Sequence, residues 1–197
     1  EYLPEQLDSL AAQSRRPDEL ILVDDASGDE TCNVAEQWLT AHDLPFKLLR
    51  NEKNAGSLRS FEKACCAVSG DYIAFCDQDD HWDADKLEQM LKAMQKMEKK
   101  DRDVPCLVFS DARVTDAQGN LLSPSFHRLQ RLHPATVSRS LYRLCVQNVV
   151  VGMAMMVNRK LLETALPFPD SAITHDWWIV LVCTATGGNI RYIPRPT

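Results

Sequence analysis

Short apolar runs alternate with amphipathic stretches along the first half of the chain. Three of these runs predict buried strands, and two of the three end in acids: "ELILVDD" (19–25), "FKLLRN" (46–51) and "DYIAFCD" (71–77). Apolar residues at helical spacing predict helices in the remaining stretches, over about 2–13, 30–41, 57–68 and 84–99. This rapid alternation of strand and helix favours right-handed βαβ units and therefore an α/β fold with a mostly parallel sheet.

The second half is more varied. Its apolar runs predict strands over "CLVFSDARVTD" (106–116), "VVVGMAMMVN" (149–158) and "NIRYIP" (189–194). Helices are predicted over 137–146, 159–166 and 175–186. The segment 117–135 is the longest irregular part of the chain.

Composition is ordinary for one globular domain, so we expect residues 1–197 to form a single unit. The net charge of −6 argues against a general nucleic-acid binder, which would carry a basic patch. One stretch, 127–143, is locally basic; it contains Arg128, Arg131, Arg139 and Arg143 with His127 and His133. A solvated helical face and an anion or acceptor site remain alternative interpretations of that stretch.

The seven cysteines are odd in number and none form a C-x-x-C pair. This usage argues against a disulfide framework or a zinc knuckle and favours a reducing, cytoplasmic environment. No apolar run reaches the roughly 18 residues that span a bilayer, and no signal peptide is visible. The chain opens on Glu1 with a helical pattern and stops at "IPRPT" just after a predicted strand. We therefore expect a fragment, truncated at both ends.

Five aspartates follow the third predicted strand in "FCDQDDHWDADKL" (75–87). Ligands of open α/β sheets bind beyond the carboxyl ends of the strands. Asp77 and Asp79 end one such strand and Asp24 and Asp25 end another, so we expect both acid pairs on the same rim.

Several interpretations of the acidic run compete. A calcium-binding EF-hand is disfavoured because its sixth position is Trp82 rather than Gly, and because a strand precedes it. A phosphoryl-transfer aspartate is disfavoured because His81 stands where such motifs place Thr or Val. A divalent metal holding a nucleotide diphosphate needs only one or two carboxylates at a strand end. Asp25 is then a candidate for accepting the N3–H of uracil or thymine. A solvated acidic turn that starts a helix remains the alternative.

Three segments together resemble family 2 glycosyltransferases with the GT-A fold: "LILVDDASGDET" (20–31), the long run from "NEKNAGS" to "DADKL" (51–87) and "ITHDWWIVLVCTATGG" (173–188). The D-Q-D-D-x-W run at 77–82 and the H-D-W-W run at 175–178 resemble bacterial rhamnosyltransferase-like members. The resemblance implies a Rossmann-like, mostly parallel sheet flanked by helices in three layers. It also implies a nucleotide-sugar-binding half at 1–100 and an acceptor-side half at 101–197.

The resemblance also implies a role for each candidate residue. On the donor side, Asp25 would read the pyrimidine base, with Asp24 beside it, and Arg59 would approach the nucleotide. Asp77 would lie near the ribose and the metal ion, and Asp79 would be the principal metal ligand. Acceptor-side residues are Asp176 as catalytic base, His175 to orient it or contact the acceptor, and Trp177 to line the acceptor pocket. For Arg59 the alternative is an ordinary exposed helix arginine, and for Trp177 it is a place in the core. Gly152 is a candidate for close approach to the donor sugar.

The implied function is an inverting glycosyltransferase that requires Mg²⁺ or Mn²⁺. It would move a sugar, with rhamnose as one candidate, from a UDP- or dTDP-sugar to a growing bacterial surface polysaccharide or a lipid-linked acceptor. It would work in the cytoplasm or, by peripheral association, at the inner face of the plasma membrane. The alternative is a GT-A-like domain that binds nucleotide or serves a structural role without catalysis.

Overall fold

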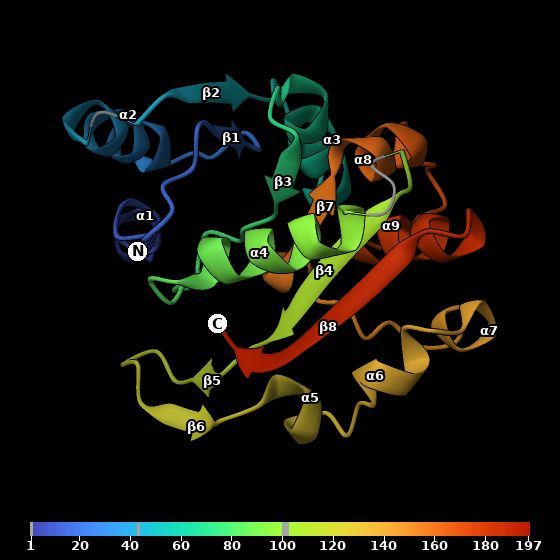
Figure 1. Ribbon diagram of the computed structural model, residues 1–197. Coiled ribbons are helices and arrows are strands. Elements are labelled where there is room, and N and C mark those ends of the chain that lie inside the picture. The colour runs from blue at the N-terminus through green and yellow to red at the C-terminus, as the bar shows by residue number, and fades with distance from the viewer. Residues whose placement is uncertain (1, 43, 100–102) are drawn as a thin grey trace.

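The computed structural model describes residues 2–42, 44–99 and 103–197 (Figure 1). Its helices are α1 (Leu3–Ala11), α2 (Thr31–Ala41), α3 (Ser57–Ala67), α4 (Lys86–Glu98), α5 (Phe126–Leu129), α6 (Pro134–Val137), α7 (Leu141–Leu144), α8 (Arg159–Ala165) and α9 (His175–Ala185), with a 3-10 turn at Gly152–Ala154. Its strands are β1 (Leu20–Asp24), β2 (Phe46–Arg50), β3 (Tyr72–Ala74), β4 (Cys106–Asp111), β5 (Val114–Thr115), β6 (Leu121–Ser123), β7 (Met155–Asn158) and β8 (Asn189–Pro196).

The central sheet has four strands in the order β3-β7-β4-β8. β4 and β8 pair in parallel, whereas β7 runs antiparallel to both of its neighbours, β3 and β4. The predicted α/β fold with flanking helices is confirmed. β3, β4 and β8 run in one direction and β7 runs against them, so the sheet is mixed rather than purely parallel. The segment predicted as one strand over 149–158 is divided: Gly152–Ala154 forms a 3-10 turn, and only Met155–Asn158 enters the sheet.

β1 and β2 pair in parallel as a separate two-stranded sheet, with Leu20 opposite Phe46. The Glu19 carboxylate, just before β1, accepts hydrogen bonds from the backbone N–H of Ser69 (2.5 Å) and of Gly70 (2.9 Å). Because Gly70 lies just before β3, this contact ties the beginnings of β1 and β3 together.

Helices cover both faces of the central sheet. In Figure 1, α4 crosses one face in front of β4, while α8 and α9 lie behind the strands. β4 is buried along its whole length and divides its side chains between two cores. Leu107 and Phe109 pack with the residues of α8 and α9, whereas Cys106 and Val108 pack with those of α4. This division follows from the alternation of side chains along a strand.

The segment 116–146 is built from short elements, which gather together at the bottom of Figure 1. The helix predicted over 137–146 is two helices, α6 and α7, with Ser138 at the end of the first and Ser140 at the start of the second. Serine favours helix ends because its hydroxyl competes for backbone hydrogen bonds. The irregular segment predicted over 117–135 contains β6 and α5. Across the described residues, no helix has the length and apolarity to cross a membrane.

Candidate active site

An acidic loop, residues 77–80, follows β3 and carries more negative charge than the surrounding protein balances. Burial raises the pKa of Asp77, and the charges of Asp79 and Asp176 raise it further. Burial, followed by the charges of Asp77 and Asp79, raises the pKa of Asp80 to about 6. Oδ2 of Asp80 is buried without a hydrogen-bond partner among the described residues, whereas Asp79 is exposed. The loop is therefore a place where a cation would be stabilised.

Lys86, at the start of α4, is the cation nearest to this charge. Only 2% of its surface is exposed, and its Nζ donates a hydrogen bond of 2.9 Å to the carbonyl of Met153. Nζ also lies 4.3 Å from the centre of the Trp82 ring, which is a cation–π contact. Burial lowers the pKa of Lys86 to about 8, although the nearby Asp80 opposes that change. Lys86 therefore balances part of the negative charge of the loop from inside the fold.

Asp176 lies in the first turn of α9, and its carboxylate is held by three donors. Oδ2 accepts the backbone N–H of Gly152 at 3.0 Å. Oδ1 accepts the backbone N–H of Trp177 at 2.6 Å and the hydroxyl of Thr174. A carboxylate offers about four lone-pair positions, so one on Oδ2 stays available for a further hydrogen bond.

The segment 152–155 connects Asp176 to the acidic loop. The backbone N–H of Gly152, the first residue of this segment, donates to Asp176, and the carbonyl of Met153 accepts from Nζ of Lys86. The carbonyl of Met155 accepts the backbone N–H of Phe75 at 3.2 Å. Phe75 stands two residues before Asp77. The structure thus brings Asp77 and Asp176 together across about a hundred positions of sequence, close enough for their charges to interact.

The ring of His175 lies beside Gly152 in this segment. Its ring stacks on Phe61 at 3.8 Å between ring centres and on Phe75 at 5.3 Å. Burial lowers its pKa to about 4, against the opposing effect of the Asp176 charge, so the ring is neutral at pH 7. A Cβ on Gly152 would lie 2.7 Å from its Nε2. The close approach that Gly152 permits in this structure is therefore to His175.

Asp25, predicted to read the nucleotide base, organises a loop. Its Oδ1 accepts from the Asn51 side chain at 2.7 Å and from the backbone N–H of Ala55 at 2.8 Å, while Oδ2 accepts from Gly56 at 2.8 Å. Hydrogen bonds from Ala55 and Asn51 lower the pKa of Asp25. The carboxylate is thus ionised at neutral pH, and it fixes the loop between β2 and α3.

Asp24, at the end of β1, is almost fully buried. Its Oδ2 accepts the backbone N–H of Ser27 at 3.2 Å, and its Oδ1 has no hydrogen-bond partner in the described part of the chain. The neighbouring Ala26 has a φ of 61°, a left-handed conformation that is uncommon for a residue other than Gly. Asp24, Ser27 and Asn51 line a hollow of about 350 Å³.

Arg59 is engaged with its own chain. Its guanidinium pairs with Glu62 on α3 and with Asp170, and donates a hydrogen bond of 2.9 Å to the carbonyl of Phe168. These contacts tie α3 to the segment that leads into α9. For the guanidinium to contact a nucleotide, it would have to exchange at least one of these partners.

Trp177 and Trp178 are half-buried and pack against the core. The indole N–H of Trp177 donates to the carbonyl of Leu144 at 2.6 Å, and that of Trp178 donates to Ala165 at 2.8 Å. Trp177 therefore anchors α7 to α9, which places α7 beside the helix that carries Asp176.

The residues present fit a divalent cation of the predicted kind. The described residues contain no group of three or more His, Cys, Asp or Glu side chains arranged around one metal position. Asp77 and Asp79 supply two carboxylates, which is enough for Mg²⁺ or Mn²⁺ when phosphates and water complete the coordination. The raised pKa of Asp77 and the unpartnered Oδ2 of Asp80 agree with a cation at this position.

Sequence reasoning missed three features of the site. Lys86 is the one cation within the acidic run, but nothing local predicted that it would be buried. The hydrogen bond from Asn51 to Asp25 joins two loops. The sequence hinted at it only because Asp25 and Asn51 each stand at the end of a predicted strand. The bond from Gly152 to Asp176 depends on the 3-10 turn, which the apolar pattern concealed.

Comparison with known proteins gives one family. The model of the family described as Glycosyl transferase family 2 matches residues 1–166. A putative teichuronic acid biosynthesis glycosyltransferase, TuaG of Bacillus subtilis, is 34% identical over 96 residues, which cover 49% of this chain and 38% of that protein.

Two solved structures share the fold. The mannosyltransferase PcManGT from Pyrobaculum calidifontis, in complex with GDP-Man and Mn²⁺, matches with a TM-score of 0.72 at 21% identity, covering 98% of this chain and 50% of that one. S. aureus TarS in complex with UDP matches with a TM-score of 0.51 at 24% identity, covering 60% and 33%. The chain spans half or less of the length of these three proteins.

Proposed function

The chain belongs to glycosyl transferase family 2, and from that premise we propose that it transfers a sugar from a nucleotide-diphosphate sugar to an acceptor hydroxyl. The reaction would be a single displacement with inversion at the anomeric carbon. The observation that carries this proposal is the position of Asp176, a half-buried carboxylate fixed by Gly152 and close enough to interact with Asp77 of the acidic loop.

Asp176 would act as the catalytic base. The acceptor hydroxyl would donate to Oδ2, the oxygen with an available lone pair, and pass its proton there as its own oxygen attacks the anomeric carbon. The hydrogen bonds from Gly152, Trp177 and Thr174 would hold the carboxylate in one orientation while the proton moves. The neutral ring of His175 would exclude water from one side of the base.

The acidic loop would hold the donor. Asp79 and Asp77 would bind Mg²⁺ or Mn²⁺, and such an ion, when bound, neutralises charge on the leaving diphosphate. The Mn²⁺ and GDP-Man of PcManGT and the UDP of TarS support a nucleotide sugar and a divalent metal in this fold.

The nucleotide would lie near the end of β1. Asp25, with Asp24 beside it, would read uracil or thymine, and Arg59 would approach the diphosphate. We place this donor half at 1–100 and the acceptor half at 101–197. A UDP- or dTDP-sugar, with rhamnose as one candidate for the sugar, would then react with a growing polysaccharide, as the name of TuaG also suggests.

A non-catalytic nucleotide-binding domain is the second candidate. The contacts that Asp25 and Arg59 make with their own chain favour it, because these side chains already have partners. The three donors that orient Asp176 favour catalysis, because binding alone requires no oriented base.

We also propose that the acceptor is presented at the cytoplasmic surface of a membrane. The exposed apolar side chains on and after α7 support this, since Tyr142 is 88% and Val146 is 82% exposed. They lie among Arg139 and Arg143, which are also exposed, and so combine apolar contact with charge suited to anionic lipid.

Calorimetry and donor turnover on the full-length protein test the proposed function. UDP, dTDP and GDP are titrated in Mn²⁺, followed by hydrolysis assays with the matching nucleotide sugars. We expect binding of one nucleotide and slow hydrolysis of its sugar, with Asp176→Asn keeping the binding and losing transfer. Failure of every nucleotide to bind would reject the proposal, and full transfer by Asp176→Asn would reject the assigned base.

A further inference from the structure

A second cavity of about 420 Å³ lies away from the acidic loop, between the α5–α6 segment and the end of β8. Its polar lining comes from Asp111, His127, Arg128, His133, Thr136 and Tyr192. Asp111 ends β4 and therefore lies at the carboxyl edge of the central sheet, where ligands of such sheets bind.

The carboxylate at the base of this cavity is fully engaged. Oδ1 of Asp111 accepts the backbone N–H of Ala112 at 2.9 Å and Nδ1 of His127 at 2.9 Å, while Oδ2 accepts the Ser125 hydroxyl at 2.5 Å. Burial alone would raise the pKa of Asp111, but the hydrogen bonds from Ser125 and from the backbone lower it. Asp111 is therefore ionised, and both of its carboxylate oxygens accept hydrogen bonds from the protein.

His127 contacts this carboxylate through its ring. Its Nδ1 lies 2.9 Å from Oδ1 of Asp111, and its Nε2 lies 2.9 Å from the carbonyl oxygen of Val149. Both ring nitrogens therefore have partners within the protein.

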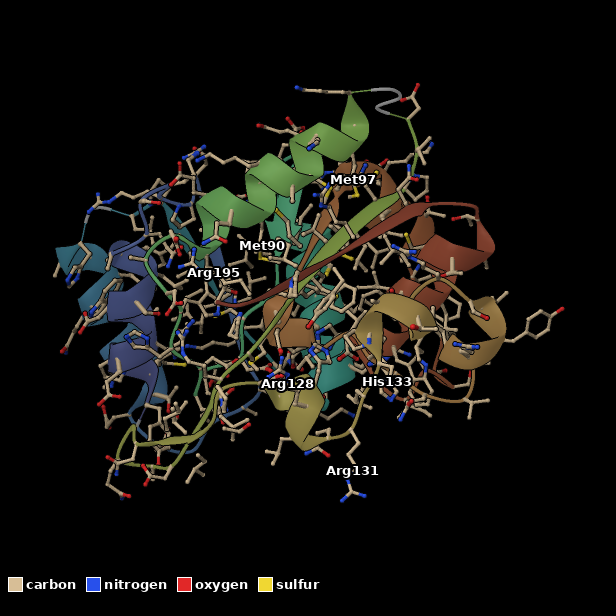
Figure 2. All side chains as sticks on the ribbon, turned by 60° about the horizontal axis from the view of Figure 1, so that its bottom comes forward. Met90, Met97, Arg128, Arg131, His133 and Arg195 are labelled. Atoms are coloured by element: carbon tan, nitrogen blue, oxygen red, sulfur yellow. The ribbon has the colours of Figure 1, made fainter. Side chains whose placement is uncertain are left out.

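Arg128 is the arginine among the residues that line the cavity. It has no carboxylate partner among the described residues, and the sequence contains no Asp or Glu between Asp116 and Glu163. Its charge acts on the Tyr192 hydroxyl, while burial and Asp111 raise the pKa of that hydroxyl to about 12 and keep it protonated. Figure 2 labels Arg128 and His133, the basic residues of the cavity lining, and shows Arg131 pointing away from the molecule.

A short segment of chain links the cavity to Asp176. His127 binds the carbonyl of Val149, and Asp176 binds the N–H of Gly152, so one short segment touches both sites. Three residues of extended chain span at most about 10 Å, which is the length of one or two sugar rings.

We infer that this cavity is a subsite for an anionic group of the acceptor, a carboxylate or a phosphate, bound by the guanidinium of Arg128 with His133 beside it. The inference rests on the proposed function, because it names the chemical class of the acceptor. Arg128 suits both anions because its planar fork donates two parallel hydrogen bonds.

Titration followed by NMR tests the inference on the full-length protein saturated with the nucleotide that it binds and Mg²⁺, so that the donor site is filled. Glucuronate and inorganic phosphate are the charged probes, and glucose is the uncharged counterpart of glucuronate. We expect at least one charged probe, but not glucose, to shift the amide signals of Arg128, His133 and Tyr192. If only phosphate or only glucuronate shifts these signals, the result would support the subsite and identify which anion it binds.

Two matched variants complete the experiment. Arg128→Gln should weaken binding of the charged probe at least about tenfold, whereas Arg131→Gln, which removes the same charge from an outward-pointing side chain, should not. The inference would be overturned if glucose bound as tightly as glucuronate, if no probe bound, or if both variants lost binding to the same extent. Binding of UDP, dTDP and GDP is measured by calorimetry before the samples are saturated, so failure of every nucleotide to bind would reject the proposed function separately.

Discussion

The backbone N–H of Gly152 donates a hydrogen bond of 3.0 Å to Oδ2 of Asp176, although 24 positions separate the two residues. Gly152 belongs to a 3-10 turn, and Asp176 lies in the first turn of α9. The orientation of the proposed base therefore depends on how closely that turn can approach the helix. Glycine permits the approach because a Cβ would lie 2.7 Å from Nε2 of the buried His175.

Gly152→Ala is expected to lower transfer by about a hundredfold while leaving nucleotide affinity unchanged. The added methyl group would push the turn away from His175, whose ring cannot yield because Phe61 and Phe75 stack against it. A displacement of about 1 Å at a reacting group can have an effect of this size. Single-turnover rates and UDP calorimetry measure the two quantities.

Gly70→Ala is the matched control, because a Cβ there meets its nearest atom at an ordinary 3.6 Å. Its activity should equal that of the wild type. A fully active Gly152→Ala protein would show that the bond between Gly152 and Asp176 does not position the base.

Asp79→Asn is expected to weaken Mn²⁺-dependent nucleotide binding at least about tenfold, since the metal loses an anionic ligand. In EDTA, the variant and the wild type should bind nucleotide equally weakly. Calorimetry with and without Mn²⁺ makes the comparison. Asp83→Asn removes the same charge from the same acidic run, but Asp83 pairs with Arg113, so its binding should be normal. Equal losses in both variants would assign the effect to overall charge.

Vesicle co-sedimentation tests the membrane surface around α7. The wild type should bind vesicles rich in phosphatidylserine and not vesicles of phosphatidylcholine, because each exposed arginine adds about 1 kcal/mol near anionic lipid. Tyr142→Glu should lose this binding. Leu121→Glu changes another exposed apolar residue, on β6, and should keep this binding. Identical behaviour of the two variants would mean that α7 has no special part in binding.

Local pattern predicted most of the fold, because alternating apolar positions are set by which face each element buries. The helix predicted over 57–68 is α3 (Ser57–Ala67), and the strand predicted over 46–51 is β2 (Phe46–Arg50). The reversed direction of β7 was not predictable in this way, because direction depends on the turn before it and on the neighbours that it meets.

The roles assigned to the candidate site residues stay predictions, but their contacts can be compared with the sequence pattern. The family resemblance singled out Asp77 and Asp176, and the structure brings them together. The buried position of Lys86 contradicts what composition alone suggests, since lysine is almost never fully buried without a partner. The hydrogen bonds of Asp25 come from the backbone of another loop, and no side-chain pattern records such donors.

Acid should destabilise the fold through His175. Its folded pKa of about 4 lies below the value of 6.5 expected when unfolded, so between these values only the unfolded state gains the proton. The contribution to stability is complete above pH 6.5 and declines as the pH falls toward 4, by up to about 3 kcal/mol. Asp80 and Asp77 act in the opposite direction, because their pKa values are raised.

His175→Gln separates these effects, because glutamine does not titrate and the carboxylates remain. The free energy of unfolding is measured in urea from pH 7.5 to 4.5 for both proteins. The advantage of the wild type should shrink by about 2 kcal/mol as the pH falls. A difference that stays constant over this range would show that His175 is not buried in its neutral form.

Lys86→Met tests whether the buried ammonium stabilises the acidic loop. Methionine keeps an unbranched side chain of similar length, but the Met153 carbonyl loses its donor and Asp80 loses an opposing charge. We expect the free energy of unfolding at pH 7.5 in EDTA to fall by about 2–3 kcal/mol. Lys92→Met is the control, because Lys92 is exposed on the same helix and its ion pair is the exposed one with Glu88; its effect should stay below about 0.5 kcal/mol.

A double-mutant cycle with Asp80→Asn identifies the source of that loss. If Lys86 acts by balancing the Asp80 charge, Lys86→Met should be less harmful once Asp80 is neutral, with a coupling of about 1 kcal/mol. If Lys86 acts only as a donor to Met153, the two effects should add, because that hydrogen bond does not involve Asp80. A stable Lys86→Met protein with no coupling would contradict both roles and would make the burial of Lys86 a matter of packing alone.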